Sequence, residues 1–265
     1  MSPLPLAELA PNAARGLVGV LCDIDDTLTW EGELVNAAYD ALFRARAAGL
    51  RVVPVTGRPA GWVDHIARMW PVDGVVGENG GLWFWVAGGQ MHRRYAQPEG
   101  ERAANRARLD ALAVRILSEV PGAALASDQR WRDLDLAVDF CEDVPRLSDA
   151  AIDRVVALFH EAGATAKVSS IHVNGWYGAF DKLAGCAAFL QDRWGETLDS
   201  TADRWLFVGD SGNDEPMFAR FPHSVGVANV ADFLPRMTAH PRYVTAAPGG
   251  HGFAELIDAV LALRA

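Results

Sequence analysis

Short runs of apolar residues alternate with amphipathic segments along the first part of the chain. The run LVGVLC at 17–22 predicts a strand that is buried on both faces, as in a parallel sheet. A helix is expected at 36–48, with Asn36 as its N-cap and Gly49 just beyond its end, because these residue types satisfy the free backbone groups at helix ends.

The same alternation continues through the next segment. A second strand is expected at 51–55 and ends in the sequence TGRP, where Pro59 suits the first turn of a helix at 60–69. Residues 72–76 predict a third strand. Strands and helices that alternate in this way indicate a doubly wound α/β sheet.

The pattern changes after residue 80. The segments at 83–86 and 90–95 flank the sequence AGG, which predicts a β-hairpin, and a helix is expected at about 101–119. Residues 132–140 then alternate strictly between apolar and acidic positions. One face carries Leu134, Leu136, Val138 and Phe140, and the other carries Asp133, Asp135 and Asp139. This alternation predicts an antiparallel strand with one face in water.

A helix at 148–162 and a strand at about 164–170 complete an α+β region, after which the α/β pattern returns. The returning elements are a helix at 181–192, strands at 205–208, 225–228 and 243–245, and a helix at 252–263. We therefore expect an α/β protein. Its Rossmann-like doubly wound parallel-sheet core is expected to comprise residues 1–82 and 179–265, and residues 83–178 to form an inserted α+β cap.

Composition narrows the classes of partner. Of 265 residues, 50% are hydrophobic, which is enough for a sizeable core. The formal net charge is −10, so nucleic acid and anionic membranes are disfavoured as partners. No apolar run approaches the roughly 18 residues of a membrane span, and we expect a cytoplasmic protein. Cys22, Cys141 and Cys186 are isolated in the sequence, which favours free thiols in a reducing compartment.

Polar residues follow the predicted core strands at four places, at the sheet edge where α/β proteins bind ligands. Asp23 and Asp25 follow the first strand and suit a hard cation such as Mg²⁺, or they form an acidic turn. Thr56 could contact a phosphate or simply cap a helix, and Lys182 could hold a phosphate or lie in solvent. The fourth place is GDSGND at 209–214, where two acids and an amide share a tight turn.

In this order, DIDDT, Thr56, Lys182 and GDSGND resemble the four motifs of the haloacid-dehalogenase superfamily. The resemblance covers nearly the whole chain, although Asp26 stands where the family usually has glycine. An insertion between the threonine and lysine motifs is the position of the family's type II cap. With ENGG at 78–81, the pattern is similar to the Cof-type, subclass IIB branch, which includes sucrose-phosphate phosphatases.

The resemblance implies a phosphatase that acts through an aspartyl-phosphate. It implies that Asp23 is the nucleophile, that Asp25 is the general acid and base, and that Thr56 and Lys182 hold the phosphate.

The resemblance also implies a magnesium site. Mg²⁺ is expected to bind Asp23, the backbone carbonyl of Asp25, and Asp210, while Asp214 positions the site and Asn213 lies just behind it.

The cap is expected to select the substrate, a small phosphorylated metabolite and most simply a sugar phosphate. Asn79, His172, Asn174 and Trp176 are the candidate contacts, although Trp176 equally suits a packing role at the hinge and His172 an ordinary strand position. The alternatives are a sugar phosphomutase of the same branch and a non-catalytic binding protein. Either a monomer or a homodimer is compatible with the sequence.

Overall fold

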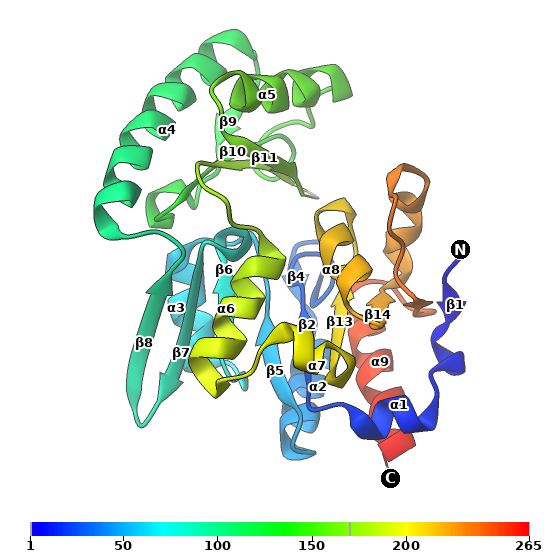
Figure 1. Ribbon diagram of the computed structural model, residues 1–265. Helices are drawn as coiled ribbons and strands as arrows, with labels where there is room; N and C mark the ends of the chain where they lie inside the picture. Colours follow the sequence, from blue (N-terminus) through cyan, green and yellow to red (C-terminus); the bar gives the residue numbers. More distant parts are fainter. Residues whose placement is uncertain (1, 170, 265) are drawn as a thin grey trace.

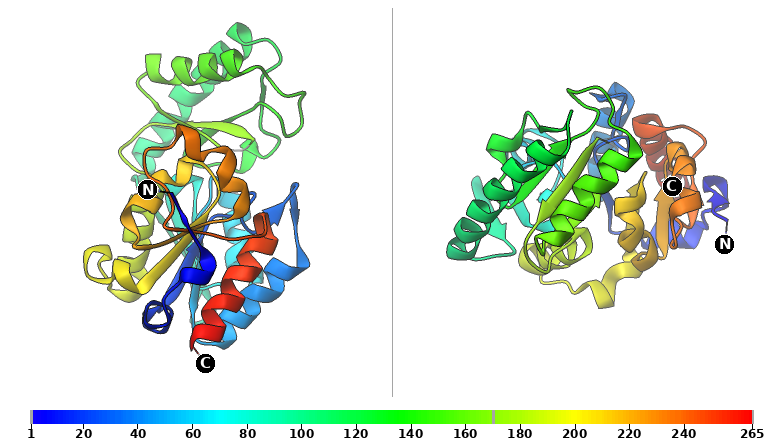
Figure 2. Two further views of the ribbon diagram at one scale, coloured as in Figure 1. Left: turned by 90° about the vertical axis from the view of Figure 1, so that its right-hand side faces the viewer. Right: turned by 90° about the horizontal axis from the view of Figure 1, so that it is seen from above.

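The computed structural model describes residues 2–169 and 171–264, and it consists of an α/β core with a smaller cap above one end (Figures 1 and 2). The core contains a six-stranded sheet in the order β1-β15-β14-β13-β2-β5, and every neighbouring pair is parallel. Its strands are β1 (Leu4–Pro5), β2 (Gly19–Cys22), β5 (Arg51–Pro54), β13 (Trp205–Gly209), β14 (His223–Gly226) and β15 (Tyr243–Val244).

Helices cover both faces of this sheet because side chains along its central strands point alternately to opposite sides. Val20 and Cys22 of β2 pack in one apolar cluster, and Leu21 packs in a second cluster on the other face. The helices of the first face are α1 (Pro11–Gly16), α2 (Asn36–Ala47), α3 (Ala60–Met69) and α9 (Gly249–Arg264). The helices of the second face are α6 (Lys182–Trp194), α7 (Leu198–Thr201) and α8 (Glu215–Arg220). The predicted doubly wound core is confirmed.

A hairpin extends the core beside β5. Strand β6 (Val75–Gly77) meets the end of β5 through a parallel bridge between Val55 and Val76, and it pairs with the hairpin β7 (Leu82–Ala87) and β8 (Gln90–Tyr95). The predicted hairpin is confirmed, but its Trp83 and Trp85 pack in the core cluster and not in the cap. The domain limits at residues 83 and 178 remain a prediction.

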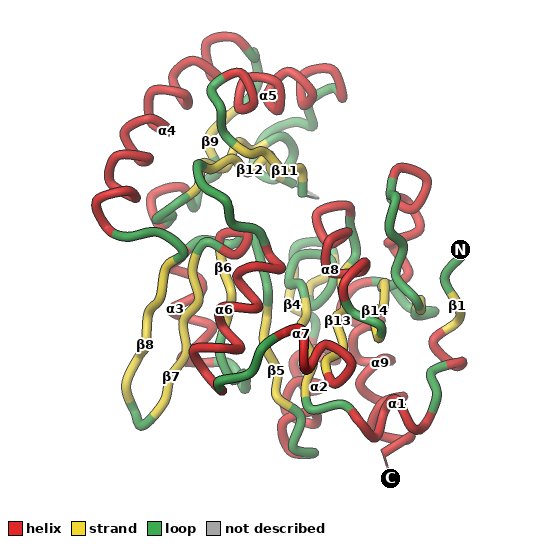
Figure 3. Tube along the Cα trace, viewed as in Figure 1, coloured by secondary structure: helices red, strands yellow, loops and turns green. Residues whose placement is uncertain are grey.

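The cap is a four-stranded antiparallel sheet with two helices on one face (Figure 3). Its strands are β9 (Ala124–Leu125), β10 (Asp135–Asp139), β11 (Thr165–Val168) and β12 (His172–Trp176), and its helices are α4 (Glu99–Glu119) and α5 (Asp149–Glu161). The apolar side chains of β10 pack under the helices with Leu109 and Phe159. The opposite face of the sheet is polar and lies toward the core.

The prediction that one face of the strand at 132–140 lies in water is wrong. Asp135 is fully buried and Asp139 is 1% exposed, because the core covers this face of the cap sheet. Strand β12, which pairs with β10 and was not predicted, places Asn174 opposite Ala137 and His172 opposite Asp139. The predicted end of the neighbouring strand at residue 170 lies outside the described residues.

Local predictions at the helix ends have mixed outcomes. Gly49 follows α2 with a φ of +79°, as expected for a residue that closes a helix. Asn36 is already the first helical residue, and Val35 is the N-cap, so the predicted asparagine cap is wrong. Pro59 likewise precedes α3 as its N-cap. Among the helices of residues 2–169 and 171–264, none combines the length and apolar character needed to cross a membrane.

Candidate active site

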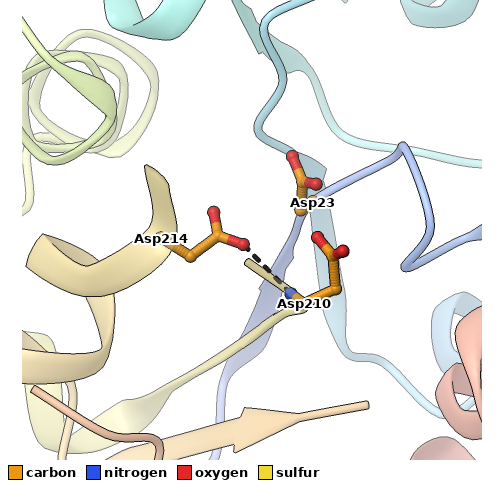
Figure 4. Close-up of side chains that lie close together, drawn as sticks. All are labelled: Asp23, Asp210 and Asp214. Atoms are coloured by element: carbon orange, nitrogen blue, oxygen red, sulfur yellow. Dashed lines mark hydrogen bonds between the residues drawn. The ribbon is translucent and has the colours of Figure 1, made fainter. Parts of the chain in front are cut away.

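Three buried carboxylates meet at the carboxyl edge of the core sheet. Asp23 follows β2, Asp210 follows β13, and Asp214 ends the short turn η5 (Gly212–Asp214). One oxygen from each lies within 4.8 Å of the others, and the residues are at most 4% exposed (Figure 4). Because β2 and β13 are paired neighbours in the sheet, motifs that are nearly 190 residues apart in the sequence end at the same point.

Lys182, the first residue of α6, is the cation of this cluster. Its Nζ lies 2.7 Å from Asp23 Oδ1 and 2.7 Å from Asp214 Oδ1, and the residue is 3% exposed. Asp181 caps α6 by accepting a hydrogen bond from the backbone N–H of Ala184, which offsets the cost of a cation in the first turn. The alternative that Lys182 is a solvated surface residue is therefore wrong.

Burial dominates the electrostatics of this cluster. It raises the pKa of Asp23 to about 8, although Lys182 acts in the opposite direction. Burial, followed by the charges of Asp23 and Asp214, raises the pKa of Asp210 well above its ordinary value. For Lys182, burial lowers the pKa, but the two adjacent carboxylates outweigh it and the net shift is upward. Three buried carboxylates against one ammonium leave negative charge that a bound cation would compensate.

Hydrogen bonds to neighbouring groups hold the carboxylates of Asp214 and Asp210 in place. Asp214 Oδ2 accepts hydrogen bonds from the backbone N–H groups of Asp210 and Ser211, at 3.1 and 3.4 Å. Asn229 donates from Nδ2 to Asp210 Oδ2 at 3.3 Å and to the backbone carbonyl of Asp26 at 3.1 Å. The sequence analysis missed Asn229. Its position just after the end of β14, at the same sheet edge, is the signal that could have found it.

Asp26, the departure from the family pattern, has a φ of +55°. This left-handed conformation is the one that glycine adopts most easily, and aspartate is among the other residues that tolerate it. The backbone N–H of Asp26 donates to Thr29 Oγ1 at 2.9 Å, which supports the turn. The turn thus keeps its shape without the usual glycine.

Asp25 is not part of the carboxylate cluster. It is held by an arginine that was not among the residues selected from the sequence. Arg58 Nε lies 2.9 and 3.1 Å from the two carboxylate oxygens of Asp25. The backbone N–H of Arg58 donates to Thr56 Oγ1 at 3.0 Å, and both Thr56 and Arg58 are buried. Thr56 therefore shapes the turn that carries Arg58. The sequence TGRP contained the signal, since a basic residue stands two positions after the selected threonine.

The cap contributes polar groups that face this site. Glu142 Oε1 accepts a hydrogen bond of 3.0 Å from Arg58, and its Oε2 lies 2.8 Å from His172 Nε2. Asn174 donates to Asp135 at 2.9 Å. Arg58 of the core thus contacts both Asp25 and the cap residue Glu142.

Arg132 forms a second link between cap and core. Its Nη1 donates to the backbone carbonyl of Gly57 at 2.8 Å and lies 3.1 Å from both carboxylate oxygens of Asp135. Its Nε donates to Asp128 at 2.9 Å, so the guanidinium is enclosed by carboxylates and by the core backbone.

The cap and core enclose a narrow cavity of about 10 Å³, which is the space of roughly one water molecule. Six of the residues selected from the sequence line it, namely Asp23, Asp25, Asp210, Asn213, His172 and Asn174, and the rest of the lining is Gly57, Arg58, Arg132, Ser169, Ile171 and Ser211. A phosphate ester needs more room than this cavity provides.

The other two candidate substrate contacts lie elsewhere. Asn79 is 4% exposed, has a φ of +53°, and its amide lies against Gly57 behind the cavity. Trp176 is 1% exposed, stacks on Phe180 and donates from Nε1 to the carbonyl of that residue at 3.1 Å. The geometry of Trp176 is that of a hinge-packing residue, the alternative stated for it above.

The chain is similar in sequence to known proteins. Residues 20–99 match a family model described as haloacid dehalogenase-like hydrolase. A phosphoglycolate phosphatase of Haloarcula marismortui is 30% identical over 246 residues, which cover 90% of this chain and 95% of that protein.

Solved structures share the fold. A protein from Thermoplasma acidophilum superposes with a TM-score of 0.71 at 19% identity, covering 92% of this chain and 99% of that one. The sucrose-phosphatase of Synechocystis, determined with sucrose and phosphate, has a TM-score of 0.63 at 16% identity, with 93% and 98% covered. The predicted α/β core with an inserted cap is the fold of these proteins.

Proposed function

The chain belongs to the haloacid dehalogenase-like hydrolases and is a phosphatase, and on that premise we propose that it hydrolyses a small phosphate monoester with Mg²⁺ through an aspartyl-phosphate on Asp23. One observation carries the proposal. The carboxylates of Asp23, Asp210 and Asp214 lie together with Lys182 at the sheet edge, beside a cavity that Asp25 also lines.

The donor set fits Mg²⁺. Buried carboxylate oxygens are its preferred protein ligands, and this cluster holds more negative charge than Lys182 neutralises. Asp23, Asp210 and the backbone carbonyl of Asp25 would hold the ion, while Asp214 would keep Asp210 in position. Bound there, Mg²⁺ would lower the repulsion between the nucleophile and the phosphate.

In the first step, a carboxylate oxygen of Asp23 forms a bond to phosphorus while the bond from phosphorus to the ester oxygen breaks. Asp25, in its acid form, gives its proton to the departing oxygen. Lys182 favours the ionised form of Asp23 and, with Thr56, offers hydrogen-bond donors to the phosphate oxygens.

In the second step, water attacks the phosphorus and the bond to Asp23 breaks. Asp25, now a carboxylate, takes the proton from the water. Inorganic phosphate leaves, and Asp23 and Asp25 return to their starting forms. Asp25 is suited to both transfers because it lines the cavity and Arg58 fixes its orientation.

Two substrate classes are compatible with this site. The sequence analysis favours a sugar phosphate, whereas the Haloarcula relative is named as a phosphoglycolate phosphatase. We favour the smaller, acidic substrate, 2-phosphoglycolate. The Arg58 guanidinium that lines the cavity suits a carboxylate.

The test is phosphate release from 2-phosphoglycolate, glycerol phosphates and hexose phosphates, with and without Mg²⁺, and with Asp23→Asn as the control. Mg²⁺-dependent release that disappears in the variant supports the proposal, and the preferred ester identifies the substrate class. Conversion of one hexose phosphate into another without free phosphate would indicate the phosphomutase. Binding of these esters without any turnover would indicate a binding protein.

A further inference from the structure

We propose that Glu142 occupies the position of a second anionic group of the substrate, and that the substrate's own carboxylate displaces it. This inference rests on the proposed phosphatase function and extends it. It assigns Arg58 and His172 to specificity and describes Glu142 as an internal competitor that the cap places in the site.

The contacts of Glu142 are those expected of a bound carboxylate. One oxygen accepts a hydrogen bond of 3.0 Å from the Arg58 guanidinium, and the other lies 2.8 Å from His172 Nε2. His172 is 3% exposed and Arg58 is 7% exposed, so both groups are largely shielded from bulk water. The contact with His172, together with Arg58, holds the pKa of Glu142 at about 2 although burial acts in the opposite direction.

The loop that carries Glu142 is held in place by a buried carboxylate. Asp139 Oδ1 accepts hydrogen bonds from the backbone N–H groups of Cys141 and Glu142, at 2.9 and 2.8 Å. Asp139 Oδ2 accepts another from Asp143 at 2.8 Å. Three bonds to one side chain fix the backbone where Glu142 enters the site. Its carboxylate therefore reaches Arg58 as part of an ordered loop.

Substrate binding has to disturb this arrangement. The cavity lined by Arg58 and His172 has room for about one water molecule, and Glu142 contacts both of these residues, so an ester that uses them under the closed cap has to take the place of the Glu142 carboxylate. An ester with a neutral tail would then leave His172, and the side of Arg58 that faced Glu142, without an anionic partner. A carboxylate on the substrate would replace the lost contacts, and charged hydrogen bonds of this kind are strong.

The class of substrate follows from this exchange. One guanidinium, that of Arg58, contacts both Asp25 and Glu142, so the ester oxygen and the substrate carboxylate have to lie close together. The expected substrate is a phosphate monoester with a carboxylate about two carbons from the phosphate oxygen. The ester oxygen would therefore lie near Asp25 while the carboxylate meets the outer edge of the same guanidinium. Neutral esters of similar size are expected to bind more weakly.

The experiment compares 2-phosphoglycolate with ethyl phosphate, which has the same two-carbon length and no carboxylate. Binding is measured by calorimetry with Mg²⁺ in the Asp23→Asn protein, so that neither ligand is turned over. Glu142→Gln and His172→Gln are introduced into this background. Glu161→Gln is the matched control, because Glu161 is a cap glutamate whose partners are Arg115 and Arg154 on the outer surface.

We expect 2-phosphoglycolate to bind about tenfold more tightly than ethyl phosphate, a difference typical of one charged hydrogen bond. Glu142→Gln should tighten the binding of both ligands, because the internal competitor is lost. His172→Gln should lower the ratio of the two affinities, and Glu161→Gln should change neither.

Three results would overturn the inference. These are equal binding of the two ligands, weaker or unchanged binding in Glu142→Gln, and an unchanged affinity ratio in His172→Gln. A Glu142 that served purely to latch the cap would give the weaker binding. Failure of the phosphatase proposal is a separate outcome, because it would appear as absent phosphate release in the protein with Asp23 intact.

Discussion

Glu78 joins the core to the cap through four backbone hydrogen bonds. Its Oε1 accepts from the N–H groups of Ala60 and Asp133 at 2.9 and 2.8 Å, and its Oε2 accepts from Leu134 and Asp135 at 2.6 and 3.2 Å. Ala60 begins α3 in the core, whereas the other three residues enter the first long strand of the cap. The side chain is fully buried, so water cannot replace any of these bonds.

The substitution Glu78→Gln keeps the size of the side chain and removes one acceptor oxygen. In either orientation, the new NH₂ group faces two N–H groups, and each buried donor without an acceptor costs about 1–3 kcal/mol. Removal of a buried negative charge is favourable and offsets part of this loss in the free energy of unfolding. We therefore expect a loss of about 2–4 kcal/mol in the free energy of unfolding.

Thermal and urea unfolding would measure the effect. At about 2–4 °C per kcal/mol for a chain of this size, the melting temperature should fall by roughly 4–16 °C. Glu161→Gln, at an exposed ion pair in the cap, should leave the free energy of unfolding nearly unchanged, because exposed ion pairs contribute little. A Glu78→Gln protein as stable as the control would refute this role of Glu78, since its four hydrogen bonds would then contribute nothing that an amide cannot supply.

Three further predictions concern the charged groups of the site. Lys182→Met should destabilise the metal-free protein by about 3–5 kcal/mol, because two buried carboxylates lose their cation, and chemical denaturation in a chelator would show it. A variant as stable as the original would contradict the pairing. Asn229→Ala should weaken Mg²⁺ activation about 10- to 100-fold, because Asp210 loses its support, and a titration of activity against Mg²⁺ would detect this. The pKa of Glu142 is lowered from 4.5 to about 2, so the contacts of its carboxylate stabilise the folded protein fully above pH 4.5. This stabilisation is lost as the pH falls from 4.5 toward 2. After allowance for solvent screening, the stability difference between the original protein and Glu142→Gln should shrink by about 1 kcal/mol between pH 5 and 3, and a constant difference would argue against the contact.

The sequence by itself determined the elements of the core and the groups that meet at its edge. Buried parallel strands are continuous apolar runs, so β2 and β13 were recognisable, and the acids that follow them had to lie at one edge of the sheet. Asp23, Asp210 and Lys182 could therefore be selected without coordinates. Their closeness also depends on the strand order, which places β2 beside β13 and which the alternation of strands and helices does not specify.

The tertiary structure alone decided what covers each polar surface. Alternation along 132–140 showed that the strand has an apolar and an acidic face, but such a pattern does not show whether the acidic face meets water or another domain. In the folded protein the core covers that face. The contact between Arg58 and Glu142, 84 residues apart, depends on how cap and core meet, and no local pattern records this. Short motifs thus predicted the chemistry of the site. The way in which the cap covers the site depends on packing between segments that are distant in the sequence.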